Sequence, residues 1–495
     1  MNHPRHPRES GDPASFSSAL EGRSGTPAFA GVTQGGSATL DRSAVRRDYR
    51  RDEEQVVAER LAQARLGPAA RAEAEAIARS LVSHVRGQKP AGLDAFLHAY
   101  DLGSEEGVAL MCLAEALLRI PDARTADELI HDKLSGPDWS DKVGESHSPF
   151  VNAATFSLLL TGKVLDAGHS ERHSLTAALG RAVGRLGEPV IRTAVGQAMK
   201  ILGGQFVFGR TIDEALARAA PERRRGLSHS FDMLGEAART MADAERYAEA
   251  YRGAIARIAL EAGEGVVRSP GISVKLSALH PRYEALHAAE ARAHILPILR
   301  ELAGQAAAAD VHLTIDAEES DRLELQMDLL EALVADDSLF AGGWTGLGIA
   351  LQAYAKRALP VTQWVIDLAR SHRRRLMVRL VKGAYWDSEI KVAQVGGYDD
   401  YPVFTRKVAT DVSYLACAKL LLEADDVVYP AFATHNATTI GTIKALAKGP
   451  FEFQRLHGMG EPLYEGLAKL ERELGQPQTP VRIYAPVGSH KELLA

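Results

Sequence analysis

The sequence predicts an α/β protein whose main domain is a (β/α)8 TIM-type barrel, and three observations lead to this prediction. After residue 225, short β-like runs alternate with amphipathic helical stretches, a pattern typical of parallel strands joined by helical crossovers. There are eight such runs, the number of strands that closes this barrel. A doubly wound open sheet is the alternative, but the first run leads into 233–237 without the glycine-rich turn typical of such sheets. The barrel is therefore favoured.

The predicted barrel spans residues 223–495, and its strands are short runs bounded by turn residues. They are Ser230–Gly235, Gly271–Leu279, Val311–Glu318, Gly346–Tyr354, Leu376–Trp386, Val427–Asn436, Phe451–Gly458 and Val481–Val487. Helices are expected between them because apolar residues recur there at helical spacing. These stretches are Glu236–Glu264, Glu284–Ala309, Asp321–Ala335, Pro360–Ser371, Lys407–Glu423, Thr438–Ala447 and Pro462–Leu474.

The chain before the barrel divides into two parts. Residues 1–41 are rich in Gly, Ser, Pro, Ala and Arg without periodicity, and we expect a disordered tail. Residues 42–222 are predicted to form a helical arm and an α-domain, with charged, exposed-helix patterns first and a more apolar helix at Gly107–Ile120 after them. Acidic, basic and ligand residues show no telling spacing there, so a scaffold role is expected.

Composition and charge exclude several classes of protein. The net charge of -6 argues against a general nucleic-acid binder. No stretch approaches the roughly 20 apolar residues that a membrane span requires. Cys112 and Cys417 lie far apart in apolar helical patterns, which indicates buried thiols in a reducing compartment. We therefore expect a cytoplasmic protein.

Polar residues stand at the carboxyl ends of the predicted strands, where a TIM barrel builds its active site. They are Asp232, Lys275, Asp316, Gln352, Arg379 with Lys382, Thr434–Asn436, Gln454 and Tyr484. Any one of them could be a structural ion-pair partner. Unpaired charges inside a closed barrel are costly, however, so their presence at every strand end predicts a functional pocket.

Two chemistries can be tested against these residues. A metal-dependent hydrolase would need a third ligand beside His435 and His457, and no convincing third histidine lies at a strand end, so no metal is expected. A Schiff-base lyase needs a lysine whose pKa is lowered by desolvation, and Lys275 or Lys382 could serve. The lyase leaves the aromatic residues near the fifth strand without a role.

The stretch 376–387 favours a third chemistry, that of a phosphate-bearing flavin. Arg379 and Lys382 supply positive charge, and Trp386 offers a flat aromatic face. Gly383 permits close approach of the backbone to a ligand. A flavin would perform the redox step while the protein orients it and tunes its electronics.

Four motifs resemble the proline dehydrogenase family, in particular the dehydrogenase half of bacterial proline utilization A. They are Val-Lys-Gly-Ala-Tyr-Trp-Asp at 381–387, Lys-Leu-Ser-Ala-Leu-His-Pro-Arg-Tyr at 275–283, Thr-His-Asn at 434–436 and His-Gly-Met-Gly at 457–460. The resemblance covers roughly residues 50–495. The helical run 106–121 is similar to the α-domain that precedes the barrel in this family.

The resemblance implies FAD at the barrel mouth and L-proline as substrate. The implied cofactor-binding residues are Gln352, Arg379, Val381, Lys382, Gly383, Ala384, Trp386, Thr405, Lys407, Thr434, His435, Asn436, Gln454 and Leu456. The implied catalytic and substrate-binding residues are Lys275, Asp316, Arg379, Tyr385 and Tyr484, with Lys275 paired to the proline carboxylate. The implied reaction is hydride transfer from proline Cδ to flavin N5, which gives 1-pyrroline-5-carboxylate. Family members pass the electrons to a membrane quinone, so a peripheral position at the inner membrane is also expected. A homodimer is a separate expectation.

The sequence departs from the family pattern in three places. Residues 1–41 show no ribbon-helix-helix pattern, so no DNA-binding module is expected. The aldehyde dehydrogenase half of proline utilization A is absent. The chain stops at Ala495, where the family continues into an eighth helix with a tyrosine and two arginines that hold the substrate carboxylate. The resemblance therefore implies a barrel that is incomplete after strand eight and a truncated member of impaired activity. The alternatives are a Schiff-base lyase on the same barrel or an inactive remnant.

Overall fold

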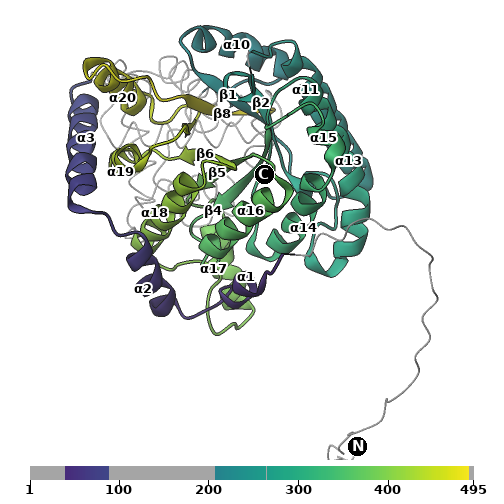
Figure 1. The fold of residues 1–495 in the computed structure, drawn as a ribbon. Helices are drawn as coiled ribbons and strands as arrows, with labels where there is room; N and C mark the ends of the chain where they lie inside the picture. The colour runs from purple at the N-terminus through teal and green to yellow at the C-terminus, as the bar shows by residue number, and fades with distance from the viewer. Residues whose placement is uncertain (1–39, 89–203, 205–206, 264, 490–495) are drawn as a thin grey trace, which may run out of the picture. The chain divides into compact units, whose positions relative to one another are not determined.

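The computed structural model describes residues 40–88, 204, 207–263 and 265–489 (Figure 1). The predicted tail lies almost entirely outside these residues, and so do most of the predicted α-domain, Cys112 and the chain after Ser489. The described part is a closed barrel of parallel strands, in the order β1 to β8, with helices around it. The predicted TIM-type barrel is confirmed.

The strands follow the chain order around the barrel, and each pairs in parallel with the next. Their bounds are β1 Ser228–Met233, β2 Gly271–Val274, β3 Leu313–Ile315, β4 Leu347–Gln352, β5 Leu376–Val381, β6 Val428–Ala433, β7 Glu452–Leu456 and β8 Val481–Val487. The barrel closes where Ser228 of β1 pairs with Arg482 of β8. Because every strand runs in the same direction, all carboxyl ends meet at one mouth.

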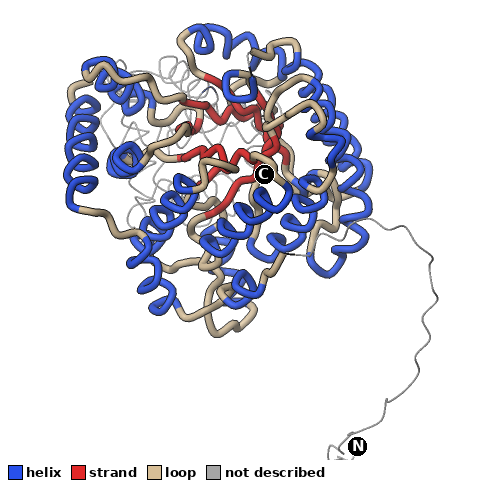
Figure 2. Tube along the Cα trace, in the orientation of Figure 1, coloured by secondary structure: helices blue, strands red, loops and turns tan. Residues whose placement is uncertain are grey.

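The helices form a layer outside the strands, shown in blue around the red strands in Figure 2. Those from α10 onward are α10 Ile212–Arg224, α11 Met241–Ala259, α12 Gly265–Arg268, α13 Ala288–Ala308, α14 Leu323–Val334, α15 Asp337–Phe340, α16 Ala358–His372, α17 Trp386–Val395, α18 Lys407–Glu423, α19 Ala437–Leu446 and α20 Glu461–Glu473. All seven predicted helical stretches of the barrel correspond to observed helices, and α18 has the predicted bounds. Apolar side chains from both layers form one buried core.

Six of the predicted strands, β2 to β7, are shorter in the structure, and β2 and β5 show a physical reason. β2 ends at Val274, because a 3-10 turn at Leu276–Ala278 follows it. β5 ends at Val381, and Gly383 has a φ of +140°, which breaks the extended run. The prediction of a strand as far as Trp386 was wrong, because helix α17 begins at that residue.

Three helices near the amino terminus pack on the outside of the barrel: α1 Ser43–Arg47, α2 Glu53–Gln63 and α3 Pro68–Arg86. Helices α3 and α19 approach closely at Gly441, where an added Cβ would lie 2.3 Å from the carbonyl oxygen of Ala74. Arg42 donates to Asp328 and Glu331 of α14, each at 2.6 Å. These contacts hold the predicted arm helices against the barrel.

Candidate active site

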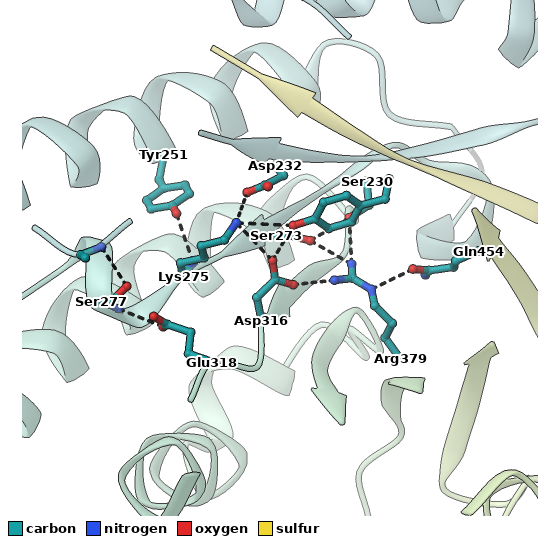
Figure 3. A network of polar contacts seen from close by, with 12 residues as sticks. Ser230, Asp232, Tyr251, Ser273, Lys275, Ser277, Asp316, Glu318, Arg379 and Gln454 are labelled. Carbon is teal, nitrogen blue, oxygen red and sulfur yellow. Dashed lines mark hydrogen bonds and ion pairs between the residues drawn. The ribbon is translucent and has the colours of Figure 1, made fainter. Parts of the chain in front are cut away.

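Asp316 lies at the centre of a buried charged cluster at the barrel mouth (Figure 3). Its Oδ1 accepts from Arg379 Nη1 at 2.5 Å, and its Oδ2 accepts from the Tyr484 hydroxyl at 2.7 Å. Lys275 Nζ lies 3.7 Å from the same Oδ2 and donates to Asp232 at 2.6 Å. Two cations and two carboxylates thus share one site, and their formal charges cancel. The structure brings together the predicted residues of strands two, three, five and eight.

Arg379 is held from three sides, although it comes from the interior of β5. Its Nε donates to Gln454 Oε1 at 2.8 Å, and its Nη2 donates to Ser273 Oγ at 2.8 Å and Ser230 Oγ at 3.2 Å. Its guanidinium also lies over the Tyr484 ring, 5.0 Å from the centroid. A guanidinium with this many fixed partners is pre-organised.

The environment of Lys275 keeps its amine charged. Burial alone would lower the pKa of Lys275, but Asp232, Tyr484 and Asp316 outweigh it and hold the pKa well above its usual range. The Tyr251 hydroxyl accepts from the backbone N–H of Lys275 at 3.1 Å, which fixes the residue at the end of β2. A charged amine binds a carboxylate, whereas a Schiff-base nucleophile must be neutral. The lyase interpretation is therefore disfavoured at Lys275.

The residues after β5 form an open rim beside the cluster. Gly383 lies against the ring of Tyr354, where a Cβ would approach within 2.4 Å, so a larger residue would displace the rim. The backbone N–H of Ala384 donates to Gln352 Oε1 at 3.2 Å, and Gln352 Nε2 donates to the Glu318 carbonyl at 2.8 Å. Val381 and Tyr385 beside them are half-buried.

Trp386 and Leu456 are exposed on this face although both are apolar. Trp386 is 41% exposed, and its ring is fixed because Nε1 donates to the carbonyl of Phe404 at 2.9 Å. Leu456 at the end of β7 is 44% exposed, and its N–H donates to His435 Nε2 at 3.0 Å. An exposed apolar side chain whose position is fixed by hydrogen bonds offers a surface against which a ligand can pack.

Lys382 and Lys407 flank one carboxylate at the start of α18. Both donate to Asp411, Lys407 at 2.9 Å. Thr405, in the loop just before this helix, donates through its N–H and its hydroxyl to the Glu53 carboxylate of α2, at 3.0–3.1 Å. The predicted phosphate-binding positions therefore lie together, and an acidic side chain of the arm engages one of them.

The predicted Thr-His-Asn group after β6 shapes the next loop. Asn436 caps α19 by accepting from the N–H of Thr439 at 3.0 Å, and Thr434 Oγ1 accepts from the N–H of Asn436 at 3.1 Å. Burial lowers the pKa of His435, in keeping with a neutral ring whose Nε2 accepts from the N–H of Leu456. The group orders the loop that supports Leu456.

These residues fit a planar, phosphorylated cofactor of the flavin type. An exposed indole and an exposed leucine offer apolar faces, peptide groups beside Gly383 offer polar contacts, and two lysines offer positive charge. Within the ranges that the structure describes, no group of three or more His, Cys, Asp and Glu residues is placed to hold a metal ion. No helix among the described residues is long and apolar enough to cross a membrane.

The sequence analysis missed several residues of the network, among them Ser230, Ser273, Glu452 and Arg482. The first two lie inside β1 and β2 and hydrogen-bond to each other at 3.1 Å. The last two form an ion pair of 2.8 Å beneath the cluster. The charged residues within the apolar runs of β7 and β8 could have indicated this ion pair, since a buried charge in a strand needs a specific partner.

Three family models match the chain. One described as proline dehydrogenase matches residues 215–495, and one described as the proline utilization A proline dehydrogenase N-terminal domain matches residues 41–86. A third, described as the DNA-binding domain of proline dehydrogenase, matches residues 92–206. The expectation that the chain carries no recognisable DNA-binding module needs correction on this point. That expectation rested on residues 1–41 alone, whereas the match lies further along the chain, almost wholly outside the described residues.

Individual relatives agree with these models. Bifunctional protein PutA of Escherichia coli (strain K12) is 50% identical over 468 residues, which are 92% of this chain and 35% of that protein. Proline dehydrogenase 1 of Bacillus subtilis (strain 168) is 29% identical over 58% of this chain and 82% of that protein. A crystal structure of Bradyrhizobium japonicum proline utilization A has a TM-score of 0.68 and 47% identity, and the match covers 90% of this chain and 44% of that one. The chain thus spans about a third of the length of the Escherichia coli relative and less than half of the Bradyrhizobium japonicum protein.

Proposed function

The chain belongs to the proline dehydrogenase family, and from this premise we propose that it oxidises L-proline to 1-pyrroline-5-carboxylate with FAD as the cofactor. The observation that carries the proposal is the neutral cluster around Asp316, which lies directly beside a rim of exposed aromatic and apolar residues. Proline is a zwitterion, and a site with paired charges can exchange its internal ion pairs for the carboxylate and the amine of such a substrate.

FAD, when bound, supplies the hydride acceptor. Trp386 and Leu456 would hold its apolar faces, Gln352 and Arg379 its polar ring edge, and Lys382 with Lys407 its phosphates. Arg379 is a fixed cation, and a cation at the ring edge stabilises the negative charge that develops on reduction. The arginine therefore favours acceptance of the hydride and raises the reduction potential.

The protein's own residues would bind and orient the substrate. Lys275 would pair with the proline carboxylate, because its environment keeps the amine protonated. Tyr484 donates to Asp316, and its ring would bound the pyrrolidine pocket together with Tyr385. Oxidation removes a hydride from Cδ and a proton from the ring nitrogen, and the proton leaves to solvent. We propose that quinone at a membrane surface then receives the two electrons.

The experiment that tests this proposal starts with the colour of the purified chain. Flavin absorption bands after addition of FAD, and bleaching of those bands by L-proline without oxygen, are the expected results. Treatment with borohydride in the presence of a carbonyl compound, the substrate type of a Schiff-base lyase, should leave Lys275 unmodified. A protein that stays colourless with FAD, or a carbonyl adduct trapped on Lys275, would refute the proposal.

A further inference from the structure

The floor of the barrel contains an ion pair that is fully buried. Glu452 begins β7 and Arg482 lies near the start of β8, and both are 0% exposed. Arg482 Nε donates to Glu452 Oε1 at 2.8 Å, and Nη2 donates to Oε2 at 3.1 Å. The remaining N–H groups of Arg482 donate to four backbone carbonyls, those of His229, Val266, Val267 and Ser269. Every N–H group of Arg482 therefore has a partner, and Glu452 is held in place as an acceptor.

This pair fixes the side-chain amide of Gln454. Gln454 Nε2 donates to Glu452 Oε1 at 2.7 Å, so its other end, Oε1, must face Arg379 Nε at 2.8 Å. A flipped amide would turn its oxygen toward the Glu452 carboxylate and its N–H2 toward the Arg379 guanidinium. Both hydrogen bonds would be lost, because the amide oxygen would face the carboxylate oxygens of Glu452 and the amide NH2 would face the N–H group of Arg379.

We propose that Glu452 and Arg482 are positioning residues for the active site. They act through Gln454 on the Nε side of the Arg379 guanidinium, whose Nη atoms are held separately, although they lie at the opposite end of the strands. The effect of Arg379 on the flavin rests on the proposed function. The orientation itself is a property of the protein alone.

Removing both members of the pair separates this role from simple stability. Loss of one member leaves a buried charge unpaired and risks unfolding, whereas replacing both with apolar side chains of similar size is often neutral. The test variant is therefore Glu452→Met/Arg482→Met. The matched control is Lys444→Met/Glu471→Met, which removes an ion pair of 2.7 Å between α19 and α20, where Glu471 is 2% and Lys444 17% exposed.

The first readout uses the flavin-free protein labelled with 15N at arginine. The Arg379 Nε–H signal is identified by its loss in Arg379→Lys. In the test variant this hydrogen should exchange with solvent roughly 10- to 100-fold faster, as expected for loss of a fixed hydrogen bond that a charged group donates. The control variant should leave it unchanged. An unchanged exchange rate in the test variant would overturn the proposal whether or not flavin binds.

The second readout is the midpoint potential of bound FAD, compared in a cycle with Gln454→Met. If the pair acts through Gln454, the test variant should shift the potential in the wild-type background and add little in the Gln454→Met background. Equal shifts in both backgrounds would show that the pair does not act through Gln454. A wild-type protein that binds no FAD would refute the proposed function, while the exchange rate of Arg379 would still decide the positioning role.

Discussion

Asp316→Asn tests whether the charged cluster is held together by its central carboxylate. The substitution keeps the size of the side chain but leaves one amide oxygen for three donors, Arg379, Tyr484 and Lys275. It also changes the formal charge of the cluster from zero to plus one. Both effects destabilise the folded protein.

The magnitude follows from the distances. At an effective dielectric constant of about 20, the Arg379 contact of 2.5 Å corresponds to roughly 7 kcal/mol of attraction and the Lys275 contact of 3.7 Å to roughly 4 kcal/mol. The asparagine costs less to desolvate than the aspartate, which offsets much of this loss. We expect a decrease of about 3–5 kcal/mol in the free energy of unfolding, as for other broken buried pairs.

Urea unfolding at pH 7 measures this decrease, with Asp426→Asn as the matched control. Asp426 pairs with Arg370 at 3.1 Å on the surface, where both side chains are about half exposed. An exposed pair typically contributes less than about 1 kcal/mol, so the control should unfold close to the wild type. The reasoning is refuted if the two variants lose the same stability.

Two further predictions concern a buried histidine and the arm. Burial, together with Arg482 and Arg379, holds the pKa of His312 well below its usual value. Below about pH 6.5 the histidine takes up a proton in the unfolded chain but not in the folded one. The free energy of unfolding should therefore fall by roughly 1.4 kcal/mol per pH unit below about pH 6.5, and this histidine costs no stability above it. Urea unfolding between pH 7 and 5.5 should show a smaller loss for His312→Gln than for the wild type, and equal slopes would contradict this. Glu53→Gln removes the carboxylate that engages Thr405 and should tighten FAD binding about two- to fivefold in a fluorescence titration, whereas Glu54→Gln on the same turn should not. Weaker binding by Glu53→Gln would contradict competition at Thr405.

The sequence determined the barrel and the face on which the site lies. Periodicity alone separates strands from helices, and parallel strands place all their carboxyl ends at one mouth. Lys275, Asp316 and Tyr484 could therefore be assigned to one site without knowing their contacts. The aromatic residues after β5 were found for the same reason, although Trp386 proved to begin a helix rather than end a strand.

Only the tertiary structure decided which of these residues contact one another. Thr405 and Glu53 are 352 positions apart in the chain, and Arg379 and Ser230 are 149 apart. Such contacts depend on the tilt and stagger of the strands and on how α2 packs against the barrel, which local patterns do not encode. The same holds for Glu452 and Arg482, whose charges look anomalous in an apolar strand until the barrel closes and β7 pairs with β8. A local pattern reflects which face of a strand is buried, whereas the partner of a buried charge is set by the closure of the whole barrel.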